Sequence, residues 1–261
     1  MPETKDFTLQ RYSQYLDEIK VNYKKILRFQ EYFVSDPIPD SFCIIRHDID
    51  RRPINALKMA RIEYEKNIRT TYYFRTKSNT YKPDIIKSIA NLEHEIGYHY
   101  ECLSDSSGNI DKAMQDFSYN LERLRHLYPI KTIAMHGRPL SRFDNREMWK
   151  DSKRHEMLFR KFGILGEVYL DINYTDIAYI SDTGRNWSST ASNIRDKVIS
   201  SIAPDFDSGK SLYDYLRLTA HPKMIFQTHP ERWSSNSFDF WSQLCQDSII
   251  NFLKIFLRTQ G

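Results

Sequence analysis

The chain has 261 residues, 40% of them hydrophobic, and a net charge of +4, which is enough material to bury a substantial core in one or two domains. This composition excludes a disordered, collagen-like or low-complexity protein, and its interspersed charges lack the basic stripe typical of a nucleic-acid binder, so we expect no nucleic-acid partner. We expect no membrane span or signal peptide either, and the three widely spaced cysteines indicate free thiols in a cytoplasmic protein.

The predicted elements begin with a helix and then alternate. Apolar side chains at helical spacing over residues 8–34 predict an N-terminal helical extension, residues 1–37, which Pro37 and Pro39 terminate. Residues 182–208 are rich in Ser, Asp and Asn and have no apolar period, which predicts a long loop. An amphipathic pattern from Phe238 to Phe256 predicts a final helix. The expected strands are 42–45, 70–74, 95–99, 131–135, 164–170, 177–180 and 223–227, and helical patterns occupy 54–64, 83–92, 111–127, 145–161 and 212–218.

Repeated strand–helix units predict an α/β fold in which helices cover parallel strands. About seven units fit a closed or nearly closed β/α barrel, and a doubly wound open sheet is the alternative. No linker rich in Pro, Gly or Ser divides the chain, so residues 1–261 are expected to form a single domain.

Half of the eight histidines occupy the ends of predicted strands, where the active site of a β/α barrel lies. The polar residues at these ends are His47, Asp48, Asp50, His99, Glu101, His136, Arg138, Asp182, Arg185 and His229. Although they are far apart in sequence, a barrel would bring them to one pocket. The other four histidines, His94, His126, His155 and His221, are expected to be structural.

Asp48 and Asp50 are two residues apart and therefore point to the same side of a strand. Two close carboxylates need a cation or a shared proton, so we expect one to ligate a divalent metal and the other to act as a base. His99 and His136 are the candidate histidine ligands, and such a triad leaves a fourth zinc position open. His229 has the ordinary pKa, about 6.5, of a general acid near neutrality.

Other catalytic schemes find less support. The sequence has no GxSxG, GxxxxGK[ST] or GxGxxG motif. Cys102 lies three residues after His99 and could form a nucleophile pair with it, but a cysteine in this context is more typical of a buried apolar site.

Four short motifs together resemble the polysaccharide deacetylase family (carbohydrate esterase family 4-like, with a chitooligosaccharide-deacetylase homology domain). The motifs are His47-Asp48-Ile49-Asp50, Gly97-Tyr98-His99-Tyr100-Glu101, His136-Gly137-Arg138-Pro139-Leu140 and Thr228-His229-Pro230. The resemblance spans roughly residues 40–235 and is greatest to members associated with bacterial surface-polysaccharide (O-antigen or lipopolysaccharide) biosynthesis. It implies a distorted (β/α)7 barrel, here with an added N-terminal helix, and a divalent metal cofactor, commonly zinc.

The resemblance also implies roles for individual residues. Asp48 matches the catalytic base, Asp50 and His99 match metal ligands, and His229 matches the acid. Arg138 falls at the arginine motif, while Asp182, Arg185 and Trp187 resemble the acidic-and-tryptophan motif that tunes the site. The family's second metal histidine is replaced by Leu103, so His136 is the substitute ligand and Glu101 the second choice. Because Ile49 separates the two aspartates, which of them ligates stays open.

The function implied is a metal-dependent hydrolase that removes an N-acyl group, expected to be acetyl, from a carbohydrate or sugar nucleotide. Tyr98, Tyr100 and Trp187 are expected to stack on the sugar, with Glu101 beside them. One alternative is a barrel that has lost the reaction and acts as a carbohydrate-binding or scaffold protein. Another is a hydrolase of a different C–N bond or of a phosphoester. The sequence does not define the oligomeric state.

Overall fold

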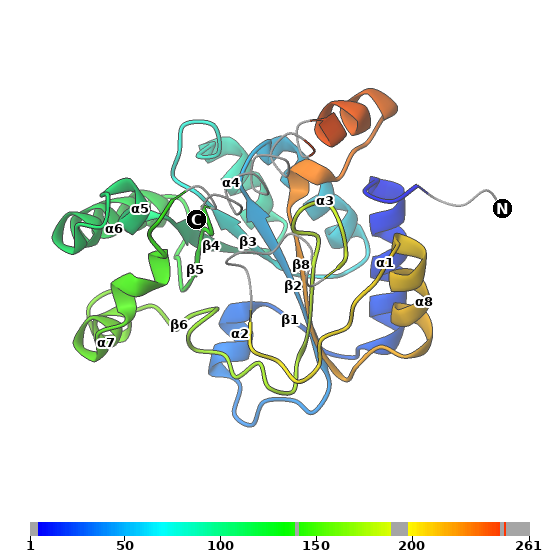
Figure 1. Ribbon diagram of the computed structural model, residues 1–261, viewed down its shortest axis with the longest axis horizontal. Coiled ribbons are helices and arrows are strands. Elements are labelled where there is room, and N and C mark those ends of the chain that lie inside the picture. Colours follow the sequence, from blue (N-terminus) through cyan, green and yellow to red (C-terminus); the bar gives the residue numbers. More distant parts are fainter. Residues whose placement is uncertain (1–4, 139–140, 189–197, 246–247, 249–261) are drawn as a thin grey trace.

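The computed structural model describes residues 5–138, 141–188, 198–245 and 248, which form a curled parallel sheet surrounded by helices (Figure 1). The strands are β1 (Ile26–Leu27), β2 (Phe42–Ile49), β3 (Thr71–Phe74), β4 (Glu95–Tyr100), β5 (Thr132–Met135), β6 (Gly166–Glu167), β7 (Ala178–Ser181) and β8 (Lys223–Thr228). Their order is β6-β5-β4-β3-β2-β8-β7, and β1 pairs with the start of β2. Sequence neighbours are thus sheet neighbours, and β8 returns to β2, as in a barrel; no β6–β7 pairing occurs among the described residues. The predicted α/β fold is confirmed, and its topology is that of a distorted barrel and not of a doubly wound sheet.

Helices follow most of the strands and cover the outside of the curled sheet. They are α1 (Leu9–Asn22), α2 (Phe29–Val34), α3 (Pro53–Glu65), α4 (Pro83–Asn91), α5 (Cys102–Asp105), α6 (Ile110–Arg125), α7 (Ser152–Arg160) and α8 (Gly209–Leu218), with 3-10 turns η1 (Asn145–Trp149) and η2 (Pro230–Arg232). Pro53 and Pro83 begin their helices, at positions where no intrahelical N–H bond is lost. Residues 237–245 and 248 are helical, and the rest of the predicted final helix lies outside the described residues.

The N-terminal extension differs from the single helix predicted for residues 8–34. Helix α1 ends at Asn22 because Tyr23 is extended, and Ile26 and Leu27 form strand β1. These two residues pair with Cys43 and Ile44 of β2, so backbone pairing with the sheet overrides their helical spacing. The chain then forms the short helix α2. The predicted strand at 164–170 is likewise reduced to the two residues of β6.

Alternation along β2 separates the barrel interior from its outer layer. Phe42 and Ile44 join an interior cluster, whereas Cys43 and Ile45 pack in the cluster formed with α1 and α8. The same period of two turns residues 46 and 48 toward the interior. The fully buried β2 strand therefore delivers polar side chains to the carboxyl end of the barrel.

Gly97 on β4 keeps the interior open for an aromatic ring. A Cβ at this position would lie 2.2 Å from the ring of Tyr73 and 3.1 Å from the carbonyl oxygen of Thr132. Only glycine therefore lets Tyr73, which is fully buried, lie against β4. Two residues later the same face of β4 presents His99.

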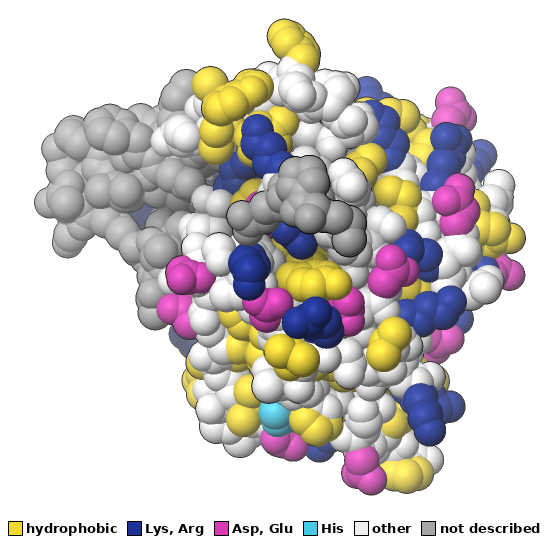
Figure 2. Space-filling model, turned by 90° about the vertical axis from the view of Figure 1, so that its right-hand side faces the viewer, with side chains coloured by type: hydrophobic (Ala, Val, Ile, Leu, Met, Phe, Trp, Pro, Cys, Tyr) yellow, Lys and Arg dark blue, Asp and Glu magenta, His cyan; other side chains and the backbone are white. Residues whose placement is uncertain are grey.

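The outer surface over α1 and α8 carries acidic and basic side chains side by side (Figure 2). None of the helices in the described part of the chain is long and apolar enough to cross a membrane.

Candidate functional site

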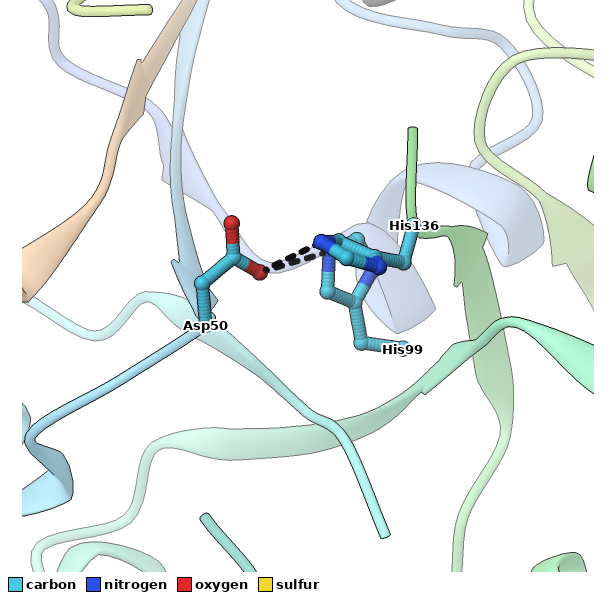
Figure 3. Close-up of side chains that lie close together, drawn as sticks. All are labelled: Asp50, His99 and His136. Atoms are coloured by element: carbon cyan, nitrogen blue, oxygen red, sulfur yellow. Dashed lines mark ion pairs between the residues drawn. The ribbon is translucent and has the colours of Figure 1, made fainter. Parts of the chain in front are cut away.

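Three potential metal ligands meet at the carboxyl end of the barrel. Asp50 directly follows β2, His99 lies near the end of β4, and His136 directly follows β5. One ligand atom from each lies within 4.8 Å of the others. Asp50 Oδ1 is 3.5 Å from His99 Nε2 and 3.4 Å from His136 Nε2 (Figure 3). The structure thus brings together the three residues that the sequence proposed as ligands.

Hydrogen bonds on the far side of each ring set which nitrogen faces Asp50. His99 Nδ1 donates to the carbonyl oxygen of Ala134 at 3.0 Å, and His136 Nδ1 donates to Glu101 Oε2 at 3.1 Å. In the neutral rings, both Nε2 lone pairs therefore point toward a carboxylate. Asp50 Oδ1 is buried and has no hydrogen-bond partner among the described residues. Three converging electron-pair donors with anchored tautomers fit a divalent cation such as zinc, with a coordination position left for water or substrate.

The electrostatics of these ligands favour a cation between them. Burial alone would lower the pKa of His136, but Asp50 and Glu101 outweigh it and raise this pKa to about 9. Burial opposes ionisation of Asp50 as well, yet His136 holds the Asp50 pKa well below its usual range. In the metal-free protein a proton on His136 therefore takes the place of a cation, and a bound metal must displace it.

Asp48 lies beside this triad and has hydrogen-bond partners of its own. Arg46 makes a bidentate contact with it, Nε to Oδ1 and Nη2 to Oδ2, both at 2.8 Å, and Gln227 Nε2 donates to Oδ2 at 2.7 Å. Burial raises the pKa of Asp48, but the Arg46 guanidinium more than offsets this and leaves the pKa below its ordinary value. The nearest candidate metal ligand is His99, whose Nε2 lies 3.5 Å from Oδ2. This geometry favours Asp50 as the ligand and Asp48 as the base.

His229 is held against Asp182. Its Nδ1 donates to Asp182 Oδ1 at 2.6 Å, and its backbone N–H also donates to that carboxylate. Arg232 and Trp233 donate to the same carboxylate from the next turn of chain. Burial and Arg232 lower the pKa of His229, but Asp182 outweighs them and raises it above its ordinary value. A buried imidazole whose pKa is raised in this way suits a general acid.

Glu231 is a further buried carboxylate at this end of the barrel, and the sequence did not single it out. It lies in η2, two residues after His229, and its side chain is 1% exposed. Arg51 Nη2 lies 3.8 Å from Oε1, and Oε2 has no hydrogen-bond partner in the described part of the chain. Burial and the nearby Asp50 raise the pKa of Glu231 to about 7.

The two arginines predicted for the site lie elsewhere. Arg138 is 41% exposed and pairs with Asp105 at the surface, with Glu101 3.9 Å away, so the guanidinium on the base is that of Arg46. Arg185 lies over the rings of Phe7 and Phe240 and donates to the backbone of Arg232. Pro139 and Leu140, which complete the arginine motif, lie outside the described residues.

The predicted sugar-stacking aromatics are buried in the hydrophobic cores. Tyr98 and Tyr100 are 1% and 0% exposed, because they face α6 and η1 on the outer side of β4. Trp187 is 4% exposed, stacks on Phe7, and donates its indole N–H to Asp6. A ring without an exposed face cannot stack on a sugar. Trp233, not Trp187, supplies the indole that contacts Asp182.

Glu101 contacts the candidate ligand triad through His136 and is not among the three residues whose ligand atoms converge. Its Oε1 accepts from Arg75 Nε at 2.8 Å, and its Oε2 accepts from His136. Burial raises its pKa, but His136 and Arg75 reduce it to about 2, so the carboxylate stays charged and orients the imidazole.

Several residues named from the sequence take structural positions. Leu103 is 1% exposed in the core. Cys102 is buried beside the Tyr98 hydroxyl, and burial raises the pKa of its thiol well above the ordinary value, which disfavours a thiolate nucleophile. His47 points to the opposite side of β2 from Asp48, where Nε2 contacts Glu63 at 2.7 Å. It belongs to a fully buried polar cluster on Glu63, together with Tyr12, Thr70 and Tyr72.

The functional partners that sequence reasoning missed are Arg46, Arg75, Gln227, Glu231, Arg232 and Trp233. Two of them had a signal. Arg46 precedes Asp48 by two residues and Gln227 precedes His229 by two, so strand alternation places each on the site face of its strand. Arg75, Glu231, Arg232 and Trp233 lie beyond strand ends, where no period applies.

Comparisons with known proteins find distant structural likeness. No family model matches the sequence, and no curated protein matches it. A CE4 family pseudoenzyme from Bacillus anthracis is 15% identical to this chain with a TM-score of 0.45, and the match covers 84% of this chain and 61% of that protein. A mutant of a pseudoenzyme of the same family is 14% identical with a TM-score of 0.41. The chain thus spans about three fifths of the first protein's length. The CE4 domain of a xylanase from the hindgut metagenome of Trinervitermes trinervoides is 10% identical with a TM-score of 0.36, over 72% of this chain and 88% of that domain. At these values the function must be argued from the chain's own residues.

Proposed function

We propose that this protein is a metal-dependent hydrolase that removes an N-acyl group, acetyl in the first instance, from a sugar. One observation supports this most directly. Asp50, His99 and His136 converge within 4.8 Å, with both imidazole tautomers anchored from behind. A guanidinium-paired aspartate and a carboxylate-paired histidine belong to the same site, and acyl transfer needs such a base and acid.

Each residue has a defined part in this proposal. A divalent ion held by the triad would polarise the acyl carbonyl and lower the pKa of an attacking water. Asp48 takes the proton from that water, because Arg46 keeps its carboxylate ionised. His229 gives its Nε2 proton to the departing amine nitrogen, since its Nδ1 is engaged by Asp182. Asp182 and Glu101 orient the two imidazoles and touch no reacting atom.

The finer assignments rest on the sequence resemblance. We place the substrate among the carbohydrates or sugar nucleotides of bacterial surface-polysaccharide assembly and take zinc as the ion. The cytoplasmic location also stays a prediction; the structure leaves Cys43 and Cys102 as buried free thiols and Cys245 as an exposed one.

Elemental analysis and an acetate-release assay test the proposal together. Purified protein should carry one equivalent of zinc and release acetate from N-acetylated sugars. Asp50→Ala should lose both while the fold is kept. Asp176→Ala is the matched control, because Asp176 is 64% exposed and pairs with Lys223 at the start of β8, the opposite end of that strand from His229.

The outcomes separate the alternatives named from the sequence. A wild-type protein without metal at neutral pH would contradict the proposal and favour a scaffold or binding protein. Bound metal with phosphate release instead of acetate release would make it a phosphoester hydrolase. Full zinc occupancy in Asp50→Ala would exclude Asp50 as a ligand.

A further inference from the structure

Most buried carboxylates at the carboxyl end of the barrel have a guanidinium of their own. Asp48 is paired with Arg46 at 2.8 Å, and Glu101 with Arg75 at 2.7 Å. Asp182 likewise accepts from Arg232 Nη1 at 2.8 Å. Each of these negative charges is therefore balanced at hydrogen-bond distance by a neighbouring side chain.

Two carboxylates of the site lack such a close partner. Asp50 has two imidazoles near Oδ1, and that oxygen accepts no hydrogen bond within the described residues. Glu231 contacts Arg51 only at 3.8 Å, and its Oε2 is buried without a partner in the same part of the chain. When both carboxyl groups are ionised, they carry two negative charges, which would balance the two positive charges of one divalent cation. Leaving buried charge unbalanced is costly in an apolar interior, so a missing cation is the simplest complement.

The chain path brings Glu231 to the same place as Asp50. Turn η2 packs on α3, and the loop joining β2 to α3 contains Asp50 and Arg51. Arg51 follows Asp50 directly, and its Nη2 lies 3.8 Å from Glu231 Oε1. The electrostatic influence of Asp50 on Glu231, which raises the Glu231 pKa, indicates the same proximity.

We infer that Glu231 is the second anionic group of the metal centre: it lies outside the triad and supplies the negative charge that, with Asp50, neutralises a divalent ion. Glu231 acts on the ion electrostatically, either directly through space or through a water molecule that donates a hydrogen bond to its carboxylate. This inference rests on the proposed metal site but not on the acyl group or the sugar.

Zinc affinity of the full-length protein tests the role, measured by competition with a chromophoric chelator. Glu231→Gln should weaken zinc binding about 10- to 100-fold, the range seen when outer partners of metal ligands are removed. Glu231→Asp keeps the charge and should stay within about threefold of the wild type, because charge balance tolerates a small displacement better than direct ligation does. Glu93→Gln is the control; Glu93 is 67% exposed and pairs with Arg69 just before β4, far from the site along that strand.

Thermal unfolding without metal separates an electrostatic role from a purely structural one. Removing a buried, unbalanced charge should leave the metal-free Tm of Glu231→Gln equal to or above that of the wild type. Added zinc should then raise the Tm less in the variant than in the wild type. A structural role would lower the Tm equally with and without zinc.

Each outcome decides one point. Equal zinc affinity in Glu231→Gln and wild type overturns the inference and leaves the proposed hydrolase intact. Weaker affinity together with no acetate release from the wild type supports the inference and overturns the proposed reaction. A wild-type protein that binds no zinc overturns both.

Discussion

Replacing Arg46 with methionine tests whether the Arg46 guanidinium is what keeps Asp48, the proposed base, charged inside the barrel. Arg46 and Asp48 are fully buried, and their bidentate contact is the main compensation for the Asp48 charge. Methionine keeps most of the apolar volume but leaves that carboxylate with only the amide of Gln227, at 2.7 Å. It also removes the guanidinium from the faces of Tyr73 and Tyr169.

The expected loss is large. Breaking a buried ion pair by removing one partner costs about 3–5 kcal/mol, because the other charge stays buried. For a chain of this size that corresponds to a fall in Tm of roughly 6–20 °C. Without Arg46, burial is the dominant effect on Asp48 and raises its pKa. The variant should therefore lose less stability at pH 4–5, where the carboxyl is protonated, than at pH 7.

Urea unfolding of the metal-free protein at pH 7 and pH 4.5 measures both effects. The double variant Arg46→Met/Asp48→Asn should recover a large part of the loss, because it buries no unpaired charge. In acetate release, the acidic limb of the pH profile of Arg46→Met should move to higher pH, because the base is protonated more readily without the guanidinium. A loss below about 1 kcal/mol, or a double variant less stable than the single one, would refute this account of Asp48.

Three further outcomes follow from other contacts. Asp182→Asn removes the carboxylate that raises the pKa of His229, so the alkaline limb of the kcat/KM profile for acetate release should move to lower pH; an unmoved limb would exclude His229 as the acid. Glu63→Gln should lower the unfolding free energy by about 1–3 kcal/mol at pH 7, and the difference should shrink as the pH falls below about 4.5, because the folded Glu63 pKa is held at about 2; a pH-independent difference in urea unfolding would contradict this. Gly97→Ala should cost about 1–3 kcal/mol in the same assay, since its Cβ would meet the Tyr73 ring, and a neutral change would show that the ring can move.

The sequence predicted the parts of the fold that depend on local patterns. Apolar runs and helical spacing identified the strand–helix alternation, and the barrel topology follows from seven such units. It failed where tertiary contacts override a pattern. Ile26 continues the helical spacing of α1, yet it pairs with Cys43 in the sheet, and that preference depends on a strand 17 residues later.

For the candidate site, too, the sequence predicted what depends on local patterns and missed what depends on tertiary contacts. Asp50, His99 and His136 were identified because each ends a strand, and barrel topology alone then brings such ends together. The environment of each side chain was less predictable. Tyr98 and Tyr100 flank His99 and looked like site residues, but alternation on β4 turns them to the opposite face, into the core. Glu231 gave no signal because its significance depends on Asp50, which lies 181 residues earlier in the sequence.

The strongest physical indication of function is a local departure from the rules of stable packing. Elsewhere in the described part of the barrel, the oxygens of buried carboxylates have partners: Glu63, for example, accepts from Thr70 and Tyr72 and contacts His47. At the carboxyl end, Asp50 and Glu231 each retain a buried carboxylate oxygen without a hydrogen bond from the described residues. A neutral side chain at either position would relieve the repulsion between them, so the metal-free fold gains nothing from keeping both. Proteins break local rules chiefly where function requires it. Two buried carboxylates, beside two imidazoles whose Nε2 atoms face Asp50, are therefore best understood as a site preorganised for a divalent ion.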